Sequence, residues 1–62
     1  MRTIDISGPG GNAFALMGYA RILAIQMGLD SNAIVNDMMS GDYEHLLEVF
    51  ENHFGHLAKL ER

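Results

Sequence analysis

The stretch that decides the fold is residues 7–12, SGPGGN, which lead directly into residues 13–27, AFALMGYARILAIQM. Before it, residues 3–6 alternate polar and apolar side chains, a pattern that predicts a short strand. Three glycines and a proline then break the strand. Asn12 is typical of a helix N-cap, because its side chain can accept from the first free helix amides. We therefore expect a strand, a glycine-rich turn and a helix in succession.

The helix expected over residues 13–27 has two apolar arcs. The first arc consists of Phe14, Ala15, Gly18, Ile22 and Ile25, and the second of Leu16, Met17, Ala20, Leu23, Ala24 and Met27. A surface helix normally has one apolar stripe, and apolar residues all round indicate burial on several sides. We expect one arc to face the core of the chain and the other to face a neighbouring subunit. The alternative is that one compact core buries both arcs.

Two further helices are expected after Gly28, which is placed to end the first helix as its C′ residue. One begins at Asp30 or Ser31, and the other runs from Asp42 to Gly55. The apolar face of the second helix consists of Ile34, Val35, Met38 and Met39, and that of the third of Tyr43, Leu46, Leu47, Val49, Phe50 and Phe54.

The tail, residues 56–62, permits two interpretations. Ala58 and Leu60 alternate with Leu57, Lys59 and Glu61, so the tail could be a strand paired with residues 3–6 or a frayed helical end. The strand is preferred, because a short strand needs a partner. The predicted fold class is mainly α (α+β), with three short helices flanked by short strands in the order β-α-α-α-β. It is expected to form one small domain, residues 1–62, that assembles into an oligomer.

Composition restricts the function classes. The chain has 62 residues, a formal net charge of −4, 48% hydrophobic residues and no cysteine, which excludes disulfides and thiolate metal sites. A domain this short is marginally stable alone, which favours support from a partner subunit. The four cations form no basic stripe, so we expect no duplex nucleic acid as a partner. Residues 13–27 are too short to cross a bilayer, and Asp5 argues against a signal peptide, so we expect a cytoplasmic protein.

The glycine-rich turn is a candidate ligand site. Amides at a helix N-terminus bind phosphate, and glycines let the backbone approach a ligand closely. The predicted ligand-binding residues are Gly8, Gly10, Gly11, Asn12, Ala13, Tyr19, Arg21 and Tyr43. The turn matches neither a P-loop nor the dinucleotide-binding glycine pattern. The alternative is a tight connection between strand and helix, without a ligand.

Arg21 lies in an otherwise apolar helix, where an arginine must reach solvent, pair with an acid or meet an anion. An ion pair with Asp37, Glu44 or Glu48 is therefore the alternative to a ligand contact.

No catalytic, metal-binding or cofactor-binding set is expected. The spacing of His45, His53 and His56 matches no metal-binding motif, and His53 falls in the apolar arc of its helix. The serines, including Ser7 and Ser40, look like turn or cap residues, and the acids gather on a solvated helix face.

Residues 4–14, IDISGPGGNAF, and residues 40–50, SGDYEHLLEVF, resemble small uncharacterised proteins encoded by tailed bacteriophages. The similarity spans nearly the whole chain. It implies a phage origin and residence in the bacterial cytoplasm. At the level of class, the chain is also similar to phage "sponges", small helical oligomers that bind cyclic nucleotide signals between subunits. That resemblance implies a counter-defence role, although no motif specific to sponges is matched.

The sequence thus predicts a non-enzymatic, homo-oligomeric binding module. Its ligand would be a small anion such as a nucleotide, with phosphate on the helix amides and a tyrosine stacked on the base or sugar. The alternatives are an acidic interaction module, in which Glu44, Glu48 and Glu51 occupy a basic site on a host protein, and a structural phage component.

Overall fold

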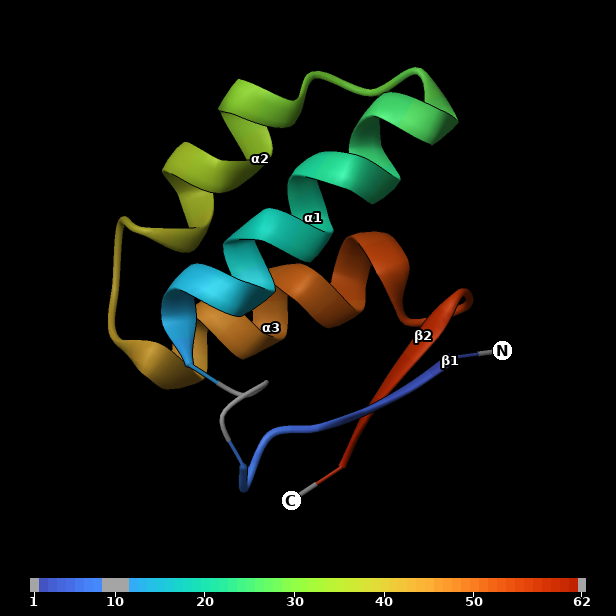
Figure 1. The fold of residues 1–62 in the computed structure, drawn as a ribbon. Helices are drawn as coiled ribbons and strands as arrows, with labels where there is room; N and C mark the ends of the chain where they lie inside the picture. The colour runs from blue at the N-terminus through green and yellow to red at the C-terminus, as the bar shows by residue number, and fades with distance from the viewer. Residues whose placement is uncertain (1, 9–11, 62) are drawn as a thin grey trace.

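The computed structural model describes residues 2–8 and 12–61. The elements are strand β1 (Arg2–Asp5), helices α1 (Ala13–Met27), α2 (Ser31–Met38) and α3 (Tyr43–Phe54), and strand β2 (Ala58–Glu61). The predicted order and the mainly helical class are therefore confirmed. The three helices pack against one another, and the two strands lie together beside α3 (Figure 1).

The two strands pair in parallel, in a register that joins Arg2 to Ala58 and Asp5 to Glu61. The ladder continues one step beyond β1, where the amide of Ile6 donates to the main-chain oxygen of Glu61 at 2.7 Å. Parallel neighbours need a long crossover connection, which the three helices together supply. The alternative of a frayed helical end for the tail is therefore wrong.

Alternation gives the sheet one inner and one outer face. Ile4 and Ala58 are buried against the helices and Leu60 is half-buried, whereas Thr3 and Lys59 are exposed on the other face. The inner face therefore closes one side of the core, and the outer face carries polar side chains.

Aspartate and asparagine side chains begin all three helices. The Oδ1 atom of Asn12 accepts from the amide of Ala15 at 2.8 Å. In the same way Asp30 accepts from the amide of Ala33 at 3.2 Å, and Asp42 accepts from the amide of His45 at 2.9 Å. Each cap satisfies an amide that has no partner within its helix. The predicted N-caps are confirmed, with Asp30 rather than Ser31 at the start of α2.

Glycines end α1 and α3 for different reasons. Gly28 adopts a left-handed conformation with φ of 74°, and the amide of Leu29 donates to the oxygen of Ala24 at 2.8 Å, as in a Schellman motif. Gly55 has an ordinary φ of −59°. A Cβ atom on Gly55 would lie 2.6 Å from the main-chain oxygen of Glu51, so glycine is needed because there is no room for a side chain.

The core forms where the second arc of α1 meets α2, α3 and the inner face of the sheet. Its buried residues are Ile4, Leu16, Ala20, Ala24, Ile34, Met38, Leu46, Leu47, Val49, Phe50, Phe54 and Ala58. The radius of gyration, 10.4 Å, matches the value of about 10.6 Å expected for a compact chain of this length.

Three expectations about apolar faces need correction. The core does not bury both arcs of α1, because Phe14, Ile22 and Ile25 of the first arc remain exposed. Met39 is 56% exposed, because α2 ends one residue earlier and its side chain leaves the buried face. Tyr43 is 38% exposed, because it lies at the first position of α3, beyond the edge of the core.

Candidate functional site

The predicted ligand loop is described in part. Gly8 is exposed, Asn12 caps α1, and Ala13 is half-buried as the first residue of that helix. The predicted contributions of Gly10 and Gly11 lie outside the described residues. The ligand-binding role of the loop therefore stays a prediction.

Arg21 does not lie near Asn12, the last residue of the loop. It follows Asn12 by nine residues, so it is about two and a half turns (~13 Å) along α1 and on the opposite side of the helix. Its guanidinium donates to Oδ1 of Asn32 at 3.0 Å and so links α1 to α2. The expected ion pair with an acid is wrong, because the neighbour that α2 presents at this level is an amide side chain.

The two tyrosines are separated as well. Tyr19 is half-buried and packs against the core, whereas Tyr43 and Ala13 both line one cavity. Of the predicted site residues, the structure thus brings Ala13 and Tyr43 together.

This cavity has a volume of about 230 Å³ and lies where the start of α1 meets the end of α2 and the start of α3. We call it the methionine cavity; its lining residues are Ala13, Met17, Met38, Met39, Gly41, Asp42, Tyr43 and Leu46. Its walls are mostly apolar, and the carboxylate of Asp42 is bound to the amide of His45 at the N-cap. Sequence reasoning missed this site, because its three methionines come from α1, from α2 and from the residue that follows α2, and the pattern of each segment is typical of an ordinary core face.

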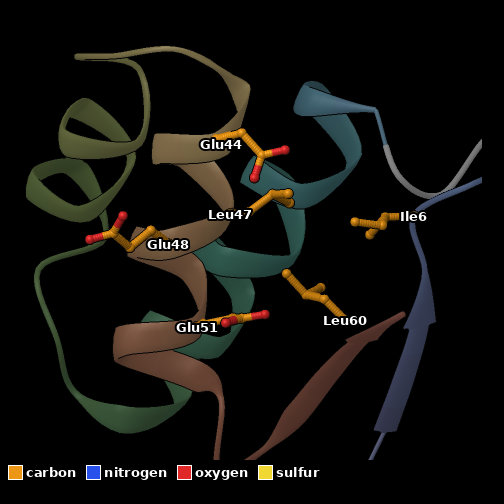
Figure 2. Close-up of a pocket in the computed structure, with 6 residues that line it drawn as sticks. All are labelled: Ile6, Glu44, Leu47, Glu48, Glu51 and Leu60. Atoms are coloured by element: carbon orange, nitrogen blue, oxygen red, sulfur yellow. The ribbon is translucent and has the colours of Figure 1, made fainter. Parts of the chain in front are cut away.

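A second hollow lies between α3 and the sheet, and it also has a volume of about 230 Å³. We call it the acidic groove; it is lined by Ile6, Glu44, Leu47, Glu48, Glu51 and Leu60. In Figure 2, Leu47 of α3 faces Ile6 and Leu60 across the hollow, while Glu48 points away from the strands. The three glutamates follow helical spacing along one side of α3, so the groove combines apolar walls with an acidic rim.

A serine, a histidine and an aspartate also meet at the α2–α3 corner. The Nε2 atom of His45 lies 3.2 Å from Oγ of Ser40, 3.0 Å from the main-chain oxygen of Asp37 and 3.2 Å from its carboxylate. A catalytic triad needs one ring nitrogen on the serine and the other on the acid. Here a single nitrogen faces all three partners, and Ser40 donates to the main-chain oxygen of Asp37 at 2.6 Å. The cluster therefore closes the C-terminal end of α2.

His53 is half-buried, with its ring 5.8 Å from that of Phe54. Among the described residues, no group of three or more histidine or acidic side chains is arranged to hold a metal ion. In residues 2–8 and 12–61, no helix has the length and apolar character needed to cross a membrane.

The remaining feature is the exposed first arc of α1, which we call the α1 stripe and define as Phe14, Gly18, Ile22 and Ile25. Phe14 is 84% exposed, Ile25 67% and Ile22 57%. Single exposed apolar residues are common, but three of them on one side of one helix are typical of an interaction surface.

The chain matches no family model, no curated protein and no solved structure. Its function must therefore be argued from its own surfaces.

Proposed function

We propose that this chain is a non-enzymatic binding module that works as a homo-oligomer. The observation that carries the proposal is the α1 stripe, in which Phe14, Ile22 and Ile25 are each more than half exposed. The stripe runs the length of α1, on the side away from Leu16. Covering it with a second copy removes apolar surface from water, the main favourable term in association.

The acidic groove supports a protein segment as the bound partner. Apolar walls from Leu47 and Leu60 accept the apolar side of an amphipathic segment, and the acidic rim complements lysine or arginine on its flanks. Together with the resemblance to phage proteins, this favours a host protein with a basic surface and a counter-defence role.

A small phosphate-containing ligand is the second candidate. It is supported by the N-terminus of α1 and by Tyr43, which lines the same cavity as Ala13, the first residue of that helix. The position of Arg21 weakens this candidate, because Arg21 lies on the opposite side of α1 from Asn12 and its guanidinium is bound to Asn32.

A pair of charge insertions on α1 tests self-association. Ile22→Glu alters an exposed residue of the stripe, so we expect a folded monomer in size-exclusion chromatography with light scattering. Leu16→Glu places a carboxylate in a fully buried position and is expected to unfold the chain. A monomeric wild-type protein would contradict the proposal.

The groove is tested with a basic amphipathic peptide made of lysine and leucine, followed by methyl NMR. We expect shifts at Leu47 and Leu60 that disappear in Glu51→Lys, which reverses one charge of the acidic rim. The control is Glu61→Lys, which changes an exposed acid at the end of β2. Equal effects of groove and control variants would show a net-charge effect and would refute the groove as the site.

A further inference from the structure

Phe14 lies directly beside the methionine cavity. It is in the first turn of α1, between Ala13 and Met17, and both of these neighbours line the cavity. The side chain of Phe14 is 84% exposed and takes no part in the lining. One surface of the molecule therefore carries a protruding ring next to a hollow. Figure 1 shows the light-blue start of α1 next to the start of α3.

The hollow suits a phenyl ring in size and chemistry. Its volume is about 230 Å³, and an apolar cavity of roughly 150 Å³ is enough to hold benzene. Met17, Met38 and Met39 can adapt their shape to a ring and make favourable contacts between sulfur and aromatic groups. Asp42 also lines the cavity, and its carboxylate accepts a hydrogen bond from the amide of His45. This carboxylate therefore keeps a hydrogen-bond partner when a ring enters the cavity.

We propose that Phe14 of one copy inserts into the methionine cavity of a second copy, and that the second copy returns the same contact. This rests on the proposed self-association and names the residues that make it. A two-fold axis brings the same patch of both subunits together, so a ring and a hollow that adjoin on one surface can be satisfied twice.

The available apolar area fits a second copy. The exposed parts of Phe14, Ile25, Met39 and Tyr43 amount to roughly 500 Å², taking about 150–250 Å² for each large side chain when fully exposed. A stable interface of standard size buries about 800 Å² on each partner. Neighbouring main-chain and polar atoms supply the remainder. The contact also extends the small core of a 62-residue chain, which buries a modest fraction of its surface alone.

Sedimentation of the full chain tests the contact. We expect Phe14→Ala to weaken the dimer by about 30-fold or more, the usual effect of truncating a central aromatic residue in an interface. Met39→Lys alters an exposed wall of the cavity and is expected to weaken it as strongly. Leu57→Ala is the control, because it truncates an exposed apolar residue outside the cavity. Circular dichroism checks that every variant is folded.

Mixing the two interface variants gives the sharper test. The Phe14→Ala copy keeps an intact cavity and the Met39→Lys copy keeps an intact ring, so a mixed dimer retains one of the two contacts. Each variant alone retains neither. We therefore expect the mixture to dimerise more strongly than either variant by itself.

The outcomes separate the two proposals. A monomeric wild-type protein overturns both. A wild-type dimer that survives Phe14→Ala, or a mixture no stronger than its components, overturns the insertion of Phe14 and leaves self-association through the rest of the α1 stripe.

Discussion

The Nε2 atom of His45 lies 3.0 Å from the main-chain oxygen of Asp37 and joins the first turn of α3 to the last turn of α2. The last carbonyl oxygens of a helix accept no hydrogen bond from an amide of the same helix, so a side chain that donates to one of them is stabilising. Gly41 permits this arrangement, because a Cβ atom on it would lie 2.8 Å from the Cβ atom of His45. Gly41 and His45, which are four positions apart, thus set the corner between α2 and α3.

We expect His45→Ala to lower the free energy of unfolding by about 1 kcal/mol, because the main-chain oxygen of Asp37 loses one of its donors and keeps Ser40. Asp37→Ala is the matched variant, since it removes the carboxylate contact at 3.2 Å and keeps the main-chain oxygen. Asp37→Ala should therefore lower the free energy of unfolding by less than His45→Ala does. Urea denaturation of both variants measures the difference, and an equal loss would mean that the carboxylate makes the main contribution.

Gly18→Ala and Gly28→Ala should have opposite effects. A Cβ atom would meet nothing within 4 Å at either position, so the two glycines differ in backbone conformation alone. Gly18 lies within α1, where alanine is favoured by roughly 1 kcal/mol. Gly28 has φ of 74°, where a side chain costs roughly 1–2 kcal/mol. Thermal unfolding at low protein concentration measures both, and destabilisation by Gly18→Ala would contradict this account.

Phe50→Ala should leave most of the protein unfolded. Phe50 is fully buried, and its ring meets that of Phe54 edge to face with centroids 5.3 Å apart. Removing such a ring costs about 3–5 kcal/mol, which is comparable with the whole stability of a domain this small. Phe14→Ala is the control and should change monomer stability by less than about 0.5 kcal/mol. A folded Phe50→Ala protein would mean that the core can collapse around the lost ring.

The turn after β1 should depend on pH through Asp5. The hydroxyl and then the amide of Ser7 donate to its carboxylate, at 2.6 and 2.9 Å, and lower the pKa of Asp5 below 3.8. The stabilising effect is therefore fully present above the unfolded pKa and is lost as the pH falls through the lower folded value. NMR titration should show the pKa of Asp5 rising in Ser7→Ala. An unchanged pKa would contradict the assigned cause.

The local structure could be predicted from the sequence because its causes are local. Asn12, Asp30 and Asp42 bind amides three residues later, so each helix start is written in a short stretch of chain. The left-handed conformation of Gly28 and the one-sided apolar pattern of α3 are equally local. Alternation in the tail indicated β2 for the same reason.

The tertiary structure alone decided which surfaces meet. The two arcs of α1 are both apolar, and only the packing of α2 and α3 onto Leu16 shows that the arc with Phe14 is left exposed. Parallel pairing of the strands, the Asn32 partner of Arg21 and the methionine cavity likewise depend on residues distant in the sequence. Hydrophobic burial has no direction of its own. A pattern can therefore mark a side chain as apolar, but only the assembled fold determines whether a neighbour within the chain covers it.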